Sequence, residues 1–360
     1  KQMDTQQMIS ALLKRVKEKD IPSQVEEAGE YYIELGVIKR DGIAIIGSSG
    51  SGRSSTLKRL VDGVASKAGA PRIILIDQKG EHRGVAWKYS WKVLGFAADS
   101  QAQEFRASFV TKDQDAVELL SDLIQEWLLQ SGQNCSTEQR ARLASVIRAQ
   151  IDALDLDELW NQFAKEPDLA QLAQKLRKGL SKSVASRIFA ESTTPLPENG
   201  NVLFDISGRG LRDPTTKEER QMVATLMLRE LLLRGVRDSL IVVEDILDRF
   251  KSESLKQRAI EIVSKLRANG NSFVVTARGQ VREFLGNNAV ELVHRLSGEK
   301  TINEVVSKFK SEIQSQSLGR AVMFLPRGYV ITSSVSDLSG QKIPSSAVKV
   351  EPLQFASSQT

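Results

Sequence analysis

The stretch that decides the fold is GSSGSGRS, residues Gly47 to Ser54. It follows the pattern of a phosphate-binding loop, GxxxxGK[ST], in which backbone N–H groups curl around phosphates and a hydroxyl holds Mg²⁺. The lysine of that pattern is replaced by Arg53. An apolar run, Ile43 to Ile46, precedes the loop, and apolar residues at helical spacing follow it. A strand, a loop and a helix in this order favour phosphate binding at the helix N-terminus.

The alternative is that the three glycines form only a flexible turn between a buried strand and a helix, since the strict pattern fails at Arg53. The flanking strand and helix favour nucleotide binding over this alternative. Arginine keeps the positive charge but replaces a compact ammonium by a planar fork, so we expect phosphate binding to survive and hydrolysis to be slowed. The expected nucleotide contacts in this stretch are Gly47, Ser48, Ser49, Gly50, Ser51, Gly52, Arg53, Ser54 and Ser55.

The composition is that of a soluble globular protein, with 360 residues, 41% hydrophobic and 26% charged. Cys135 is the single cysteine, and His82 and His294 are the only histidines, which argues against an internal disulfide or a zinc cluster. Any metal should therefore be Mg²⁺ held by carboxylates. The net charge of +5 favours contact with a polyanion.

The sequence indicates no membrane-spanning segment, because no apolar run approaches about eighteen residues. It also shows no signal peptide. We therefore expect a cytoplasmic protein, at the inner face of a membrane only through a partner or a preceding region. The first residue is Lys1 rather than methionine, which is compatible with such a region.

Short β-branched runs separated by helices predict an α/β fold with a mostly parallel sheet. The predicted strands are Ile43–Ile46, Arg72–Asp77, Asn201–Ser207, Ser239–Glu244 and Ser272–Thr276. The predicted division is 1–40 as a connecting segment, 41–98 and 200–335 as two parts of one core, 99–199 as an inserted helical subdomain, and 336–360 as a C-terminal strap or tail. An insert is expected because the second and third strands are too far apart for a simple crossover.

Helical patterns fill this insert, and two more follow it. The predicted helices of the insert are Ala116–Leu129, Glu138–Leu154, Asp168–Leu180 and Ser183–Ala190. Thr216 and Glu219 form a capping box that opens a helix to Leu233. A further helix, Leu255–Arg267, ends before Gly270. Near the C-terminus, Ala321–Leu325 and Tyr329–Ser333 predict a β-hairpin.

Two adjacent acids, Glu244 and Asp245, end the hydrophobic strand that begins at Ser239. A phosphate loop needs such acids at the tip of another strand, where one orients Mg²⁺ and the other aligns the attacking water. The alternative for Asp245 is a helix N-cap. The presence of a phosphate loop in the same chain favours the catalytic interpretation.

This arrangement resembles the HerA/FtsK superfamily of ring-forming DNA translocases, most closely its archaeal HerA branch and the related conjugative and DNA-uptake ATPases. The resemblance extends over residues 40–353 and includes further segments beyond the loop and the acids. These segments are IDQKGEH (Ile76–His82), NVLFDIS (Asn201–Ser207), KLRANG (Lys265–Gly270), LPRGYVI (Leu325–Ile331) and IPSSAVKVEPL (Ile343–Leu353). It implies a RecA-like P-loop NTPase core, ATP and Mg²⁺ as ligands, and a homohexamer around duplex DNA.

The resemblance also implies roles for individual residues. Glu244 and Ser54 would hold Mg²⁺, and Asp245 stands where the family has its catalytic glutamate, one methylene shorter. Asp77 and Glu81 would lie beside the nucleotide, with Glu81 among the catalytic residues.

Arg267 and Thr276 are also assigned by the resemblance. Arg267 would be an arginine finger that reaches the γ-phosphate of a neighbouring subunit, although a solvent-facing cation at a helix end is the alternative. Thr276 stands at the sensor position, but the glutamine that follows it in the family is Ala277 here. Arg295 is a second candidate for a contact between subunits, and an ion-pair partner at the edge of the core is the favoured interpretation.

DNA contacts should be directed at phosphates, since a translocase must move over any sequence. Arg209 and Arg212, in the GRGLR loop after the third strand, are the first candidates, and Lys178 and Lys182 in the insert come next. A solvated charged face is the alternative for all four.

Three hypotheses follow for the function. The first is an ATP- and Mg²⁺-dependent DNA-translocating hexamer, which could work with a nuclease or a membrane channel. The second is a nucleotide-binding subunit that no longer hydrolyses ATP, as Arg53, Asp245 and Ala277 suggest. The third, a small-molecule phosphotransferase, fits the long insert and the strap-like tail poorly.

Overall fold

The structure is a computed structural model of the whole chain. It describes residues 38, 42–96, 98–99, 102–106, 114–130, 132, 134–150, 156–179, 194–209, 211, 215–245, 250–279, 281–286, 289–297, 301–303, 323, 329–332, 335–336, 342–343 and 346–349. The chain divides into two compact units. The first consists of Lys1–Pro71, Asp238–Asp248 and Asn271–Thr360, and the second of Arg72–Arg237 and Arg249–Gly270.

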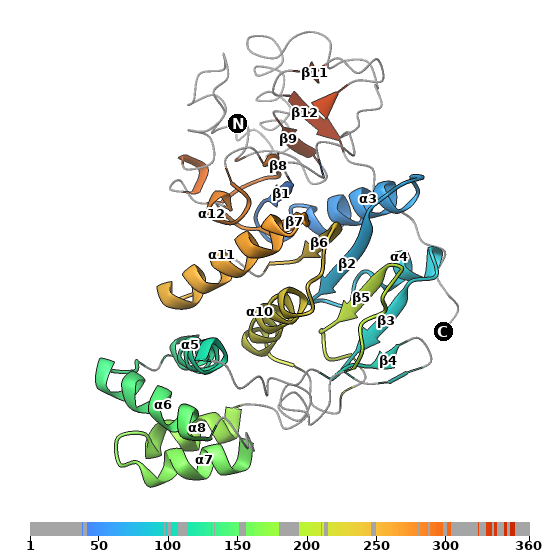
Figure 1. The fold of residues 1–360 in the computed structure, drawn as a ribbon. Helices are drawn as coiled ribbons and strands as arrows, with labels where there is room; N and C mark the ends of the chain where they lie inside the picture. The colour runs from blue at the N-terminus through green and yellow to red at the C-terminus, as the bar shows by residue number, and fades with distance from the viewer. Residues whose placement is uncertain are drawn as a thin grey trace. The chain divides into compact units, whose positions relative to one another are not determined.

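The first unit contains a sheet in which strand β1 (Ile43–Ile46) precedes the phosphate loop. β1 pairs in parallel with β7 (Ser272–Ala277) on one side and with β8 (Val290–Val293) on the other. β6 (Ser239–Val243) pairs in parallel with the far edge of β7 (Figure 1). All residues of β1, β6 and β7 are buried, as expected for strands covered on both faces.

Two antiparallel strands extend this sheet beyond β8. β9 (Tyr329–Thr332) pairs with β8, and β12 (Ser346–Lys349) pairs with β9, so the order within the unit is β12-β9-β8-β1-β7-β6. Of the predicted hairpin, the second strand is present as β9, whereas 321–325 lies outside the described residues except for Met323, so the hairpin stays a prediction. A sequence pattern shows that a segment is a strand but not which long-range neighbour it pairs with.

The remaining elements of the first unit are short or follow the loop. Helix α3 (Arg53–Ala65) begins directly after the phosphate loop, and α12 (Arg282–Leu285) is a single turn between β7 and β8. β10 (Val335–Ser336) and β11 (Lys342–Ile343) form a separate two-stranded antiparallel sheet.

In its described residues, the second unit contains four parallel strands. β2 (Arg72–Asp77) pairs with β5 (Val202–Asp205), β5 pairs with β3 (Lys92–Gly95), and β3 pairs with β4 (Gln103–Glu104). β3 and β4, like β8 in the first unit, were not predicted, because each is short and contains a charged residue. The predicted α/β class and the mostly parallel sheet are confirmed.

Three helices of the second unit follow its strands or lie beside them. α4 (Arg83–Lys88) follows β2, and α10 (Lys217–Leu233) packs against α11 (Glu253–Ala268). The predicted capping box opens α10: the Thr216 hydroxyl accepts a bond from the Glu219 N–H at 3.1 Å, and the Glu219 carboxylate accepts one from the Thr216 N–H at 2.7 Å.

Four consecutive helices occupy the region of the predicted insert: α5 (Gln114–Gln130), α6 (Thr137–Gln150), α7 (Leu156–Lys165) and α8 (Ala170–Gly179). Each packs against the next, and α5 also packs against α10 and α11 (Figure 1). α5, α6 and α8 correspond to predicted helices, whereas α7 was not predicted.

Several predictions fall outside the described residues, namely the helix at 183–190, nearly all of the segment 1–40, and most of the tail 336–360. The five-part division of the chain therefore stays a prediction. Among the described helices, none has the length and apolar character needed to cross a membrane.

Candidate nucleotide site

The phosphate loop connects β1 to α3 and depends on its glycines. A Cβ at Gly47 would lie 2.6 Å from the Cβ of His294 and 2.6 Å from the Ser51 hydroxyl, so no side chain fits there. Gly52 precedes α3 with a φ of 112°, a left-handed conformation that favours glycine. Gly50 is exposed, and no described atom lies within 4 Å of where its Cβ would be. The loop is therefore tightly packed at Gly47 and open to solvent at Gly50, next to the N-terminus of a helix. Backbone N–H groups in this position can bind phosphate.

The segment that follows β8 forms hydrogen bonds with the loop and with α3. The Ser48 N–H donates to the carbonyl of Arg295 at 2.8 Å, and the Ser48 hydroxyl accepts the N–H of Ser297 at 2.7 Å. The Thr56 hydroxyl lies 2.9 Å from Nε2 of His294, and both residues are buried. Ser48 was predicted as a nucleotide contact, whereas Thr56, His294 and Ser297 were not predicted as part of the site. The signal available in the sequence was His294, a polar residue directly after the segment that forms β8. The sequence does not show that β8 lies beside β1.

The two acids after β6 lie in the same unit as the loop. Glu244 is 0% exposed and Asp245 is 7% exposed. Nη1 of Arg53 donates to Oδ1 of Asp245 at 2.6 Å, although 192 positions separate the two residues. Asp245 therefore lies close to the loop, as was predicted for the acid pair. Arg53 forms an ion pair with the expected catalytic acid, and its contact with phosphate stays a prediction.

Asp245 is held in an unusual backbone conformation by Thr276. Its φ is 47°, a left-handed value that aspartate tolerates better than most residues. The Asp245 N–H donates to the carbonyl of Thr276 at 3.1 Å and to its hydroxyl at 3.0 Å. The same hydroxyl donates to Oδ1 of Asp245 at 3.1 Å. Thr276, which was predicted as a nucleotide contact, thus contacts the acid.

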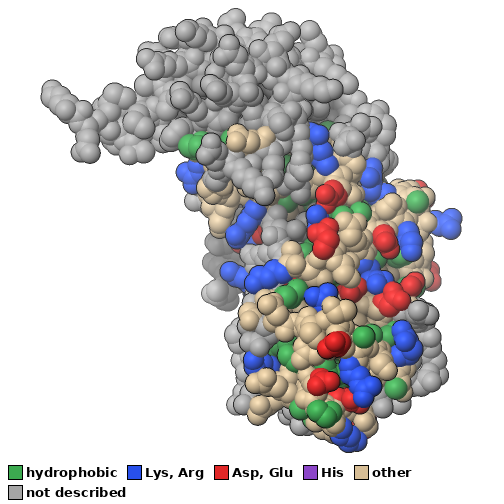
Figure 2. Space-filling model, turned by 90° about the vertical axis from the view of Figure 1, so that its left-hand side faces the viewer, with side chains coloured by type: hydrophobic (Ala, Val, Ile, Leu, Met, Phe, Trp, Pro, Cys, Tyr) green, Lys and Arg blue, Asp and Glu red, His purple; other side chains and the backbone are tan. Residues whose placement is uncertain are grey.

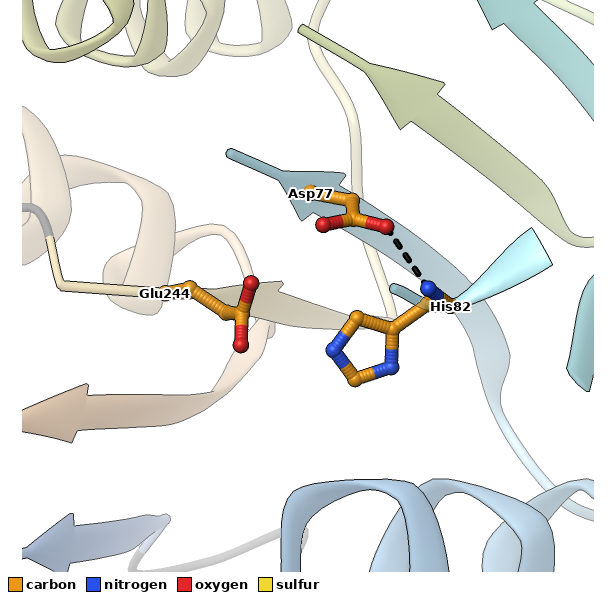
Figure 3. Close-up of side chains that lie close together, drawn as sticks. All are labelled: Asp77, His82 and Glu244. Carbon is orange, nitrogen blue, oxygen red and sulfur yellow. Dashed lines mark hydrogen bonds between the residues drawn. The ribbon is translucent and has the colours of Figure 1, made fainter. Parts of the chain in front are cut away.

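In the second unit, Asp77 organises the turn that carries Glu81. The buried Asp77 carboxylate accepts bonds from the N–H groups of Lys79, Gly80 and His82 at 2.8–2.9 Å, and Figure 3 shows the last of these. Glu81 is exposed at the end of this turn. Asp77 thus fixes a backbone turn, and its predicted contact with a nucleotide stays a prediction, as does that of Glu81. Figure 3 also labels Glu244, which follows β6 of the first unit.

An ion-pair network stabilises the segment after this turn. Arg83 donates to Asp205 at 2.6 Å and to Asp99 at 2.7 Å, with 5% of its side chain exposed. Burial opposes the charge of Arg83, but the bonds to the two carboxylates outweigh it and raise the pKa of the guanidinium. These ion pairs therefore link the start of α4 to Asp205 of β5 and to Asp99.

The loop, Ser54 and Glu244 offer groups that could bind a nucleotide phosphate and Mg²⁺. A loop that is tightly packed at Gly47 and exposed at Gly50 fits a phosphate. Ser54 is half-buried in the first turn of α3, and Glu244 offers a carboxylate at the end of β6. Hydroxyl and carboxylate oxygens are the ligands that Mg²⁺ prefers in such sites. The donor set therefore fits a nucleotide phosphate with Mg²⁺.

The other predicted residues stay predictions. Arg267 is half-buried in the last turn of α11, a position where the helix dipole also favours a cation. Arg209 is exposed, whereas Arg212, Lys182 and the side chain of Lys178 lie outside the described residues. On the face shown in Figure 2, basic and acidic side chains are interspersed over the described part of the surface.

The chain is similar to known proteins in sequence and in fold. A family model described as "Helicase HerA, central domain" matches residues 27–325. No curated protein matches the sequence. The fold is similar to VirB4 of Thermoanaerobacter pseudethanolicus, with 14% identity, a TM-score of 0.58, and coverage of 89% of this chain and 93% of that one. It is also similar to the plasmid coupling protein TrwB in complex with ADP and Mg²⁺, with 14% identity, a TM-score of 0.56, and coverage of 93% and 91%. Another TrwB structure, in complex with the ATP analogue ADPNP, has 13% identity, a TM-score of 0.53, and coverage of 94% and 93%.

Proposed function

Because the chain belongs to the family of the HerA helicase central domain, we propose that it is a P-loop ATPase that uses ATP and Mg²⁺ to translocate DNA. The family and the similarity of the fold to VirB4 and TrwB support a nucleotide-dependent function of the translocase type. We further propose that it works as a homohexameric ring around duplex DNA, together with a nuclease or a membrane channel.

The proposed roles follow the positions of the residues. The amides of the loop from Gly47 to Ser55 bind the phosphates, and Ser54 and Glu244 hold Mg²⁺, which neutralises the charge that develops on the phosphates. Asp245 orients the attacking water. Glu81 and Arg267 act at the γ-phosphate, Arg267 from the neighbouring subunit.

DNA contacts are proposed for Arg209, Arg212, Lys178 and Lys182, directed at phosphates. Such contacts carry no sequence information, which suits a motor that moves over any sequence.

The observation that carries the proposal is the 2.6 Å distance between Arg53 and Asp245. It brings the first residue of α3 to an acid that lies two residues beyond the end of β6. A glycine loop at a helix N-terminus fits phosphate binding, and an acid at this distance fits the alignment of water for hydrolysis.

The same ion pair favours a second candidate function, a nucleotide-binding subunit with impaired hydrolysis. A carboxylate that already accepts bonds from a guanidinium and a hydroxyl is a poorer partner for the attacking water. In this alternative the chain binds ATP, does not turn it over, and contributes structure or regulation to a DNA-processing or DNA-transfer complex.

Steady-state ATPase assays with and without duplex DNA separate the two candidates. The translocase proposal predicts hydrolysis that DNA stimulates and that Asp245→Ala abolishes, with particles of six chains in native mass measurements when ATP and DNA are present. Tight ATP binding in calorimetry without turnover under either condition would support the second candidate. A chain that neither assembles nor binds nucleotide would contradict both.

A further inference from the structure

Arg53 and Asp245 form a buried charge pair within the proposed nucleotide site. Their side chains are 7% and 8% exposed, and Nη1 and Oδ1 are 2.6 Å apart. Removing one partner of a buried pair leaves a charge that is neither solvated nor neutralised, which is strongly unfavourable. Any process that takes Arg53 away from Asp245 must therefore supply Arg53 with another anion.

Of the two partners, Asp245 is the one that the fold holds in place. Its N–H donates to the carbonyl and the hydroxyl of Thr276, and that hydroxyl donates back to Oδ1. Its left-handed backbone, with φ of 47°, is kept by these contacts. Arg53 extends a long side chain with several rotatable bonds from the first residue of α3. A change of partner is therefore easier for Arg53 than for Asp245.

The natural alternative partner for Arg53 is a phosphate. The planar guanidinium bonds carboxylates and phosphates with the same fork geometry. In the pattern of the loop, this position contacts the terminal phosphates. One guanidinium thus has two competing anions, the carboxylate of Asp245 and a phosphate that the loop binds.

We infer that Arg53 is a positioning residue that couples phosphate binding to Asp245, and that Asp245 acts as an internal competitor of the nucleotide. A nucleotide phosphate gains Arg53 by displacing the Asp245 carboxylate, and this lowers the affinity for the nucleotide. The displacement removes the cation from Oδ1, so that the carboxylate can orient water only after phosphate has bound. The inference rests on the proposed function, because it concerns the same site.

The competition can be measured with ADP and without Mg²⁺, by calorimetry in EDTA on the full chain. Asp245→Asn removes the charge that competes for Arg53, and it is expected to raise the affinity for ADP by about ten-fold or more. Glu244→Gln is the matched control, because it removes the same charge from the adjacent position without removing the carboxylate that Arg53 contacts. A gain in Asp245→Asn well above the gain in Glu244→Gln supports the inference. Equal gains, or none in either variant, would overturn it.

Arg53→Lys provides an independent variant if thermal unfolding shows that Asp245→Asn is not folded. Lysine keeps the charge and is the residue that the loop pattern places against the terminal phosphates, so a phosphate should displace Asp245 more easily and ADP should again bind more tightly. Unchanged or weaker ADP binding in Arg53→Lys would count against the competition.

Turnover of ATP with duplex DNA is a separate measurement that tests the proposed function. Tighter ADP binding in the variants without turnover in the native chain would contradict the motor and leave the competition standing. Turnover in the native chain with unaltered ADP affinity in Asp245→Asn would support the motor and contradict the competition.

Discussion

Glu126 offers a strong test of the packing between the helical insert and the core of the second unit. Its side chain lies on α5 and is 2% exposed. The carboxylate accepts the N–H of Lys251 at 2.8 and 3.0 Å and the N–H of Ser252 at 2.6 Å. Ser252 is the N-cap of α11, so Glu126 places a negative charge at the positive end of that helix. We predict that Glu126→Gln destabilises the protein.

The magnitude follows from these contacts. Glutamine keeps one acceptor oxygen and replaces the other by an NH₂ group, which cannot accept the backbone N–H groups it would face. The loss of a hydrogen bond to a buried charged group costs about 1.5–3 kcal/mol. The lost interaction with the helix dipole adds about 0.3–1 kcal/mol. A total of about 2–4 kcal/mol corresponds to a decrease in Tm of roughly 3–5 °C, because the entropy of unfolding is about 2.1 cal/mol/K per residue and the chain has 360 residues.

Thermal unfolding followed by circular dichroism measures this change. Glu166→Gln is the control, because the Glu166 carboxylate accepts a bond from Arg142 at 2.7 Å but both side chains are partly exposed, and such pairs contribute about 1 kcal/mol or less. The reasoning would be refuted if Glu126→Gln melted within about 1 °C of this control, since the buried carboxylate would then contribute no more than a surface ion pair.

Two further predictions concern a turn and a thiol. Gly80→Ala should lower the free energy of unfolding by about 2–4 kcal/mol, because φ is +70° and a Cβ would lie 2.8 Å from the Ser207 hydroxyl. Gly69→Ala is the control, with φ of +71° and no described atom within 4 Å, and should lower it by about 1 kcal/mol. Urea unfolding of both variants measures the difference, and equal losses would argue against the contact. Burial raises the pKa of the Cys135 thiol, only partly opposed by Arg140, so the unfolded chain loses this proton first and the free energy of unfolding should fall as the pH rises above 9.0, the ordinary thiol value. Urea unfolding at several pH values should show a smaller fall in Cys135→Ala, and an identical fall in both proteins would contradict this account.

The elements with a strong local signal could be predicted from the sequence. The bounds of β1 and β2 agree with the prediction, because each contains a continuous apolar run of the kind that a two-sided sheet requires. The start of α10 agrees as well, because the Thr216 and Glu219 side chains that form its cap are neighbours in the chain. β3 and β4 could not be predicted, since both are short and each contains a charged residue. α7 was missed although the sequence carries its signal, because Leu156, Leu159, Trp160 and Phe163 have the spacing of one helix face.

The site was partly predictable for the same reason. The loop pattern and the acids after β6 are contiguous in the sequence, and each has a recognisable local form. The contacts of Thr276 with Asp245, and those of His294 with Thr56, depend on strand order and on register. A single sequence contains no direct record of either.

The sequence alone determined that a glycine loop stands between a buried strand and a helix, and that two acids end another buried strand, because these features depend on residues next to one another. Only the tertiary structure showed which carboxylate Arg53 contacts. Its partner is 192 positions away, and the pairing of β1 with β7 and of β7 with β6 brings the two together. A charge near a loop can serve a ligand or an internal counter-ion, and the choice depends on which anion the fold places within hydrogen-bond distance.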